Sequence, residues 1–150
     1  MSPYFYFISL LKYQRKLSVK YLKRERIMAD SIFERLGGGE AVSAAVDVFY
    51  GKVLADERIK HFFAGVDMDQ QKKHMEGFMK YAFGGSANYT GKSLREAHKH
   101  LVEEMGLSDE HFDAVLENLG ATLKDIGVDD ALITEAAQIV ESTRSDVLNK

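Results

Sequence analysis

Proline is confined to position 3, so residues 28–150 contain none. A proline inside a helix removes a backbone hydrogen bond and clashes with the preceding turn, and its absence leaves this whole stretch free to be helical. Apolar residues in the same stretch recur with a period near 3.6, whereas the alternation typical of strands is hardly present. The sequence therefore predicts an all-α fold.

Five apolar stripes at helical spacing predict five amphipathic helices. The stripes are Val42, Val46, Phe49 and Val53; Gln71, His74, Met75, Phe78, Met79 and Ala82; Leu94, His98, Leu101 and Met105; Phe112, Val115, Leu116, Leu119 and Leu123; and Leu132, Ile133, Ala136, Ile139 and Val140. A short helix at residues 31–36 and a helical turn at 56–63 complete the expected elements.

Residues typical of helix ends lie beside these stripes. Ser31 and Ser93 each precede a glutamate by three residues, the spacing of a capping box, and Asp67 can cap the helix that follows it. Gly106 and Gly127 come directly after periodic stretches, where a left-handed residue closes a helix. These signals place the helix boundaries that the stripes alone leave open.

Cysteine is absent, which excludes disulfides, zinc fingers, iron–sulfur ligation and covalent c-type haem attachment. The net charge of −3 is unevenly distributed: residues 1–27 carry seven basic and one acidic side chain, a net of +6, so the remainder carries −9. Because an acidic body is repelled by a phosphate backbone, no nucleic acid is expected as a partner.

The first 28 residues differ from the rest, with an aromatic run followed by a lysine- and arginine-rich stretch. A secretory signal has the reverse order, and the apolar run is too short to span a bilayer. A membrane-surface or transit arm is one interpretation. We favour the other, in which Met28 is the true start, residues 1–28 lie outside the fold, residues 29–150 form one domain, and a membrane surface is not a partner.

His98 shares an apolar face with Leu94, Leu101 and Met105, so its ring should point into the core. A haem iron on one ring nitrogen and a backbone carbonyl on the other would satisfy both. A core histidine with ordinary hydrogen-bond partners explains the same periodicity. No clustered metal-ligand spacing, phosphate-binding loop or nucleophile elbow offers a rival site.

Three polar residues on other predicted helices could face His98 across a cofactor. Tyr50 lies at the edge of one stripe, and Gln71 and His74 lie on another. A phenol and a carboxamide are neutral donors that can hold a small polar ligand, although a helix-edge tyrosine also suits plain packing. His74 could equally be a boundary residue. The polar, glycine-rich stretch 84–92 between two histidine-bearing helices suits a chain that wraps a flat cofactor better than a packed bundle.

From Ser31 onward the chain resembles the group I truncated haemoglobins, and most closely the cyanobacterial, cyanoglobin-like members. The resemblance rests on the order and spacing of several segments. They are FERLGG (33–38), VFYGKVLADERIKHFFAGVDM (48–68), YAFGG (81–85), REAHKHLVEEMGL (95–107) and DVLN (146–149). It implies a shortened globin, with two helix pairs in a two-over-two sandwich around a non-covalent haem b.

The same resemblance implies roles for single residues. His98 would be the proximal iron ligand, and His74 matches a distal histidine that can itself coordinate the iron. Some relatives carry a histidine near the carboxyl terminus that attaches covalently to the haem. Residues 140–144 of this chain contain none, so extractable haem is expected.

Four further residues complete the implied pocket. Tyr50 and Gln71 fall at the distal hydrogen-bonding positions, and Phe62 or Phe63 at the aromatic position that wedges the haem. The family then implies a cytoplasmic, monomeric globin that binds O2, NO, CO and related ligands reversibly. One alternative is a redox enzyme that converts NO to nitrate with bound O2, or detoxifies peroxide, with a separate reductase. A helical interaction module without a cofactor is the other.

Overall fold

The structure is a computed structural model that describes residues 12–22, 31–84 and 93–150, and its regular secondary structure there is entirely helical. Besides a helix at residues 12–22, the elements are α2 (Ile32–Arg35), α3 (Gly38–Ala55), the 3-10 helix η1 (Lys60–Phe63), α4 (Met68–Ala82), α5 (Leu94–Met105), α6 (Asp109–Asp125), α7 (Asp130–Glu141) and α8 (Arg144–Val147). The all-α prediction is confirmed. The predicted loop at 84–92 lies outside the described residues, apart from Gly84.

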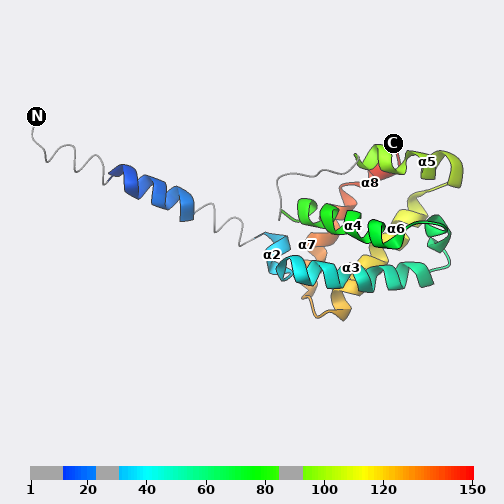
Figure 1. The fold of residues 1–150 in the computed structure, drawn as a ribbon, viewed down its shortest axis with the longest axis horizontal. Coiled ribbons are helices and arrows are strands. Elements are labelled where there is room, and N and C mark those ends of the chain that lie inside the picture. Colours follow the sequence, from blue (N-terminus) through cyan, green and yellow to red (C-terminus); the bar gives the residue numbers. More distant parts are fainter. Residues whose placement is uncertain (1–11, 23–30, 85–92) are drawn as a thin grey trace, which may run out of the picture.

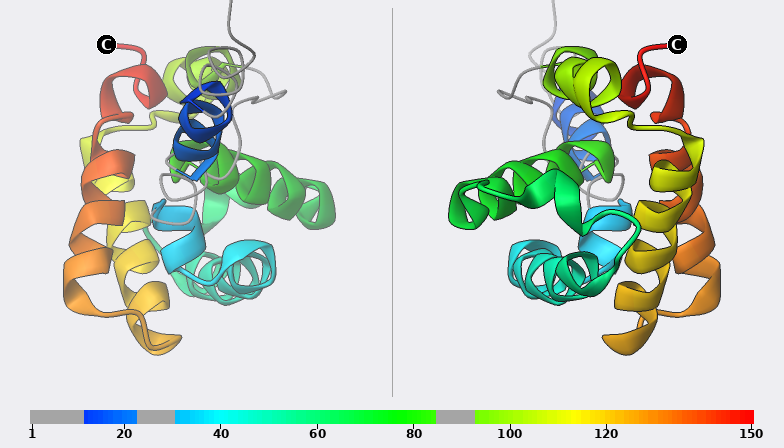
Figure 2. Two further views of the ribbon diagram at one scale, coloured as in Figure 1. Left: turned by 90° about the vertical axis from the view of Figure 1, so that its left-hand side faces the viewer. Right: turned by 90° about the vertical axis from the view of Figure 1, so that its right-hand side faces the viewer.

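Two helix pairs form the body of the molecule. Helices α3 and α4 pack side by side, and α6 packs against α7. Figure 2 shows the second pair crossing the first, with α5 and α8 together at one end. This is the two-over-two arrangement expected from the sequence (Figure 1).

The core lies where α3 crosses α6. Val46 and Val53 of α3 are completely buried, and Phe49 between them is 2% exposed, as is Leu119 of α6. Each of these side chains contributes about 1.5–3 kcal/mol when removed from water. The stripe that begins at Val42 therefore forms the centre of the protein, and the first residue of the candidate site, Tyr50, directly follows Phe49.

The expected helix ends are observed. The hydroxyls of Ser31 and Ser93 each accept a hydrogen bond from the N–H of the glutamate three residues later, and the Asp67 carboxylate accepts from the first turn of α4. Gly106 and Gly127 adopt left-handed φ angles of 73° and 87°. These caps fix the beginning of α4 and both ends of α5, the two helices that carry the candidate histidines.

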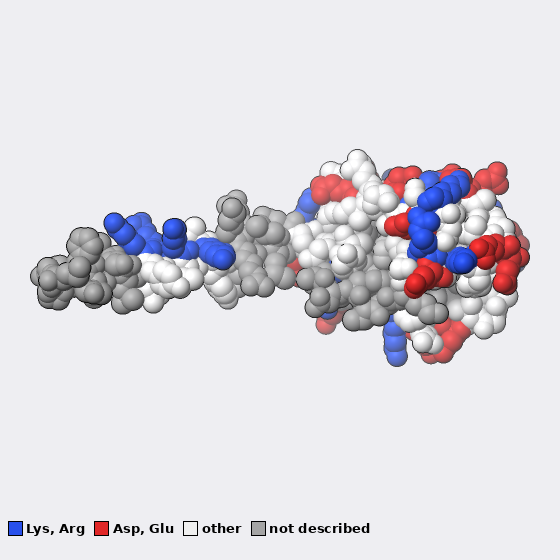
Figure 3. Space-filling model, turned by 90° about the horizontal axis from the view of Figure 1, so that it is seen from above, with Lys and Arg blue, Asp and Glu red and all other residues white. Residues whose placement is uncertain are grey.

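The helix at residues 12–22 is exposed along its length, and its basic side chains are Lys12, Arg15, Lys16 and Lys20. Figure 3 shows this basic run, whereas acidic and basic side chains are interspersed on the visible face of the body. Within the described ranges, no helix combines the length and apolar character needed to cross a membrane.

Candidate functional site

His98 lies in the second turn of α5, and its ring is half-buried. Its Nδ1 is 2.7 Å from the carbonyl oxygen of Leu94, one turn earlier. Because a carbonyl can only accept, Nδ1 carries the proton and donates it, which leaves the Nε2 lone pair of the neutral ring available to a metal. The backbone thus fixes both the tautomer and the direction of the ring.

The pKa of His98 lies below that of a free histidine. Burial is the main cause, and the nearby His100 adds to the shift, while the hydrogen bond to Leu94 opposes it. The lowered pKa favours the neutral imidazole, which is the form that binds a metal.

Tyr50 and Gln71 meet between α3 and α4. The side-chain Nε2 of Gln71 donates to the Tyr50 hydroxyl over 3.0 Å, and Tyr50 is only 2% exposed. Burial raises the pKa of Tyr50 more strongly than the Gln71 hydrogen bond lowers it. The phenol therefore keeps its proton, and since its oxygen already accepts from Gln71, the O–H can be donated to a ligand.

The two candidate phenylalanines have different surroundings. The Phe63 ring is half-buried and packs edge-on against Tyr50, with ring centroids 5.7 Å apart. Phe62 is 7% exposed and packs instead against the rings of His61 and His111, at 4.1 and 4.9 Å. Phe63 is therefore the member of the pair that adjoins the Tyr50–Gln71 hydrogen bond.

His74 is exposed on α4, three residues after Gln71. The imidazole of His74 is therefore more exposed than its place on the apolar stripe of α4 indicates. Three residues correspond to about 300° around a helix, so His74 and Gln71 project from neighbouring positions of one face. The structure brings Tyr50, Gln71 and Phe63 together. His74 lies beside them, at the edge of the α4 face that carries Gln71.

A cavity of about 540 Å³ lies between α4, α5 and the carboxyl-terminal part of the chain. Its walls are Phe78, Tyr81 and Ala82 of α4, Leu94 of α5, Ile139 of α7, and Ser142, Thr143 and Asp146. Phe78 comes one turn after His74, and Leu94 one turn before His98. Periodicity signalled the apolar members of this wall, but Tyr81, Ser142 and Thr143 lie off the stripes and were not predicted.

The donor set suits haem better than a metal ion held by protein ligands alone. One neutral imidazole projects from α5, and a neutral hydrogen-bonding pair with an aromatic neighbour lies between α3 and α4. The parts of the chain that the structure describes contain no cluster of three or more His, Cys, Asp or Glu able to hold an ion. A porphyrin supplies four of the iron's ligands itself, so a single imidazole is enough.

Comparison with known sequences and structures gives a consistent family. A model of the family described as bacterial-like globin matches residues 31–149. A group 1 truncated hemoglobin of Synechocystis is 54% identical over 122 residues, covering 80% of this chain and 98% of the relative. One from Tetrahymena pyriformis is 53% identical over 120 residues, with 80% and 96% coverage.

Solved structures agree with the sequence comparison. A 2/2 hemoglobin from Synechococcus, solved in the cyanomet state with covalently attached heme, superposes with a TM-score of 0.78 at 52% identity, over 80% of this chain and 99% of the other. The Fe(III) form of the Tetrahymena pyriformis truncated hemoglobin gives 0.74 at 52% identity, over 81% and 100%.

Proposed function

This chain belongs to the bacterial-like globin family, among the group 1 truncated haemoglobins, and from that membership we propose how its own residues serve a haem globin. The protein binds haem and, through it, small diatomic ligands such as O2. When bound, the haem iron supplies the coordination position at which such a ligand is taken up. The family does not favour the redox alternative.

We assign the proximal ligand to His98. The observation that carries this assignment is the 2.7 Å contact from Nδ1 to the Leu94 carbonyl, which orients Nε2 and keeps it unprotonated. A backbone carbonyl that accepts from the other ring nitrogen is a usual partner of a metal-bound histidine. The pKa of His98 is lowered, chiefly by burial, which favours the neutral ring that can bind iron.

Tyr50 and Gln71 form the ligand-stabilising pair on the opposite side. Gln71 holds the Tyr50 oxygen, and the phenol presents its O–H to a ligand that gains negative charge on binding. Phe63, which packs against Tyr50, is assigned the aromatic position beside the haem. Phe62 is assigned to the packing between η1 and α6.

His74 is proposed as a second, displaceable iron ligand. His74 lies near Gln71 on α4, and its ring is exposed and so is not held by packing in the core. The test compares ferric and ferrous absorbance spectra of the haem-loaded chain with those of His74→Leu. Low-spin spectra that become high-spin in the variant support ligation by His74, and unchanged spectra contradict it.

The haem is proposed to be of the b type and non-covalent. The five histidines of the chain are His61, His74, His98, His100 and His111, so none occurs after residue 111. Ser142 and Thr143, not a histidine, border the cavity at the carboxyl-terminal end. The chain therefore offers no imidazole in this region for a bond to a haem vinyl group.

The functional unit is proposed to be residues 29–150, acting as a cytoplasmic monomer, with residues 1–28 outside it. The family match beginning at residue 31 supports this boundary. Titration of the full chain with haemin, followed at the Soret band, tests the function as a whole. Saturation at one haem per chain supports it, and the absence of a sharp Soret band would overturn it.

A further inference from the structure

Helix α5 carries His98 but buries no side chain completely. Helices of this length usually owe most of their stability to a buried apolar face. Among the described elements, its principal neighbour is α8, the short carboxyl-terminal helix (Figure 2). What holds α8 in place therefore bears on the position of the imidazole.

Polar contacts join α5 to α8. The Arg95 guanidinium donates to the Asp146 carboxylate over 3.0 Å and to the Lys150 carbonyl over 2.9 Å. The side chain of Asn149 returns a hydrogen bond of 3.0 Å to the Arg95 carbonyl. Leu94, directly before Arg95, supplies the carbonyl that orients His98.

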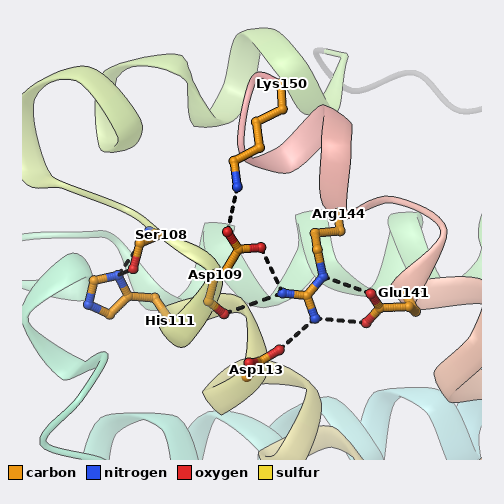
Figure 4. Close-up of polar contacts among 7 residues, drawn as sticks. All are labelled: Ser108, Asp109, His111, Asp113, Glu141, Arg144 and Lys150. Atoms are coloured by element: carbon orange, nitrogen blue, oxygen red, sulfur yellow. Dashed lines mark hydrogen bonds and ion pairs between the residues drawn. The ribbon is translucent and has the colours of Figure 1, made fainter.

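A second group of contacts joins α8 to α6 and α7, and we call it the Arg144 cluster: Arg144 and Lys150 with Asp109, Asp113 and Glu141 (Figure 4). The Arg144 guanidinium donates to all three carboxylates, and Lys150 pairs with Asp109.

The Arg144 cluster is more than a single surface ion pair. The Arg144 side chain is 23% exposed, and its guanidinium carbon lies 4.4 Å from the centre of the Phe112 ring. Isolated surface pairs contribute little, but a partly buried guanidinium that joins several carboxylates in fixed geometry forms a cooperative network. Removing Arg144 would leave Asp109, Asp113 and Glu141 without their shared counter-charge.

We propose that the Arg144 cluster positions the proximal histidine: it fixes α8 on the amino-terminal end of α6, and α8 holds α5 and thereby His98. Arg144 and Arg95 are positioning residues that act through α8. This inference rests on the assignment of His98 above. Asp146 and Thr143, on either side of Arg144, border the same cavity as Leu94, so loss of α8 would also open the wall of that cavity.

The test uses the full chain with three matched arginine substitutions. Arg144→Gln removes the cluster, and Arg95→Gln breaks only the link between α8 and α5. Arg35→Gln is the control, because Arg35 forms a bidentate pair with Glu135 between α2 and α7, away from α5. Haem transfer to an excess of apomyoglobin and hydrogen exchange of the haem-free chain are measured for each.

Arg144→Gln and Arg95→Gln are expected to release haem roughly tenfold faster and to raise amide exchange in α5, while exchange in α3 stays unchanged. Arg35→Gln is expected to do neither. Raising the salt from about 0.05 to about 0.5 M NaCl should speed haem release from the wild type more than from Arg144→Gln, because the variant has already lost the ion pairs of Arg144.

Unchanged α5 exchange in either test variant overturns the inference, as does an equal rise in α3 and α5, which would mean general destabilisation. If Arg144→Gln does not fold, Arg95→Gln alone decides. A wild type that binds no haem would refute the proposed function, while the exchange comparison would still decide whether the cluster holds α5.

Discussion

At the scale of single residues, the Tyr50 hydroxyl is the group whose removal should most affect ligand release. Tyr50→Phe keeps the buried ring but deletes the O–H and leaves the Gln71 amide without its 3.0 Å partner. The bound O2 would then lose the hydrogen bond from the phenol, and losing a hydrogen bond in a buried site costs about 1–3 kcal/mol. O2 should therefore dissociate roughly tenfold or more faster, as measured by stopped-flow ligand replacement. A rate within twofold of wild type would contradict the role given to Tyr50.

The half-buried ring of His98 should make the stability of the haem-free chain depend on pH. Its pKa in the folded chain is lowered, chiefly by burial, so the unfolded chain binds the proton more readily as pH falls below about 6.5. The folded haem-free chain should therefore lose stability as pH falls from there toward the lowered pKa.

Urea unfolding of the haem-free chain at several pH values measures this effect. His98→Leu should remove part of the loss between about pH 7 and 5, because it deletes the imidazole whose pKa is lowered in the folded chain. Equal acid sensitivity in wild type and His98→Leu would contradict the burial of the ring.

At the scale of elements, the turn between α2 and α3 depends on glycine. Gly37 has a φ of 113°, and a Cβ there would lie 2.8 Å from that of Ala41. Gly37→Ala should cost about 1–3 kcal/mol in the free energy of unfolding. Gly51→Ala, within α3 and with open space around the added carbon, should instead stabilise by about 0.5–1 kcal/mol. Chemical denaturation measures both, and equal effects would refute the steric argument.

Some elements could be predicted from the sequence and others could not. The stripe of α3 and the caps at Ser93 and Asp67 are local patterns, and they placed their helices correctly. Helix α8 has four residues and buries no side chain completely, so it has no apolar period to detect. Its place depends on Val147 and Leu148, which pack toward the core, and on the contacts of Arg144 with carboxylates of two other helices. Spacing along the chain does not reveal such a long-range arrangement.

The candidate site shows the same limit. Tyr50 and Gln71 lie on different helices, and only the packing of α3 against α4 brings them to 3.0 Å. Phe62 packs on His111 and Phe63 packs on Tyr50. Because the two are neighbours in sequence, no local pattern predicts which of them lies beside Tyr50. Periodicity alone left His98 open between a core residue and a ligand, and the family resemblance supplied the role.

At the scale of the whole molecule, we expect the folded chain to hold its haem by non-covalent contacts alone. Acidified acetone should extract all of the haem from the protein, because residues 112–150 provide no histidine for a covalent bond. Absorbance of the two phases, with mass spectrometry of the chain, measures the outcome. Haem mass remaining on the polypeptide would refute non-covalent binding.

Rescue by free imidazole tests whether His98 holds the iron. His98→Gly in the full chain should lose the wild-type Soret spectrum and regain it when free imidazole is added, since the small ligand can replace the deleted ring. His100→Gly, two residues away and exposed, should keep the wild-type spectrum without imidazole. A His98→Gly variant that retains the wild-type spectrum without imidazole would show that His98 does not hold the iron.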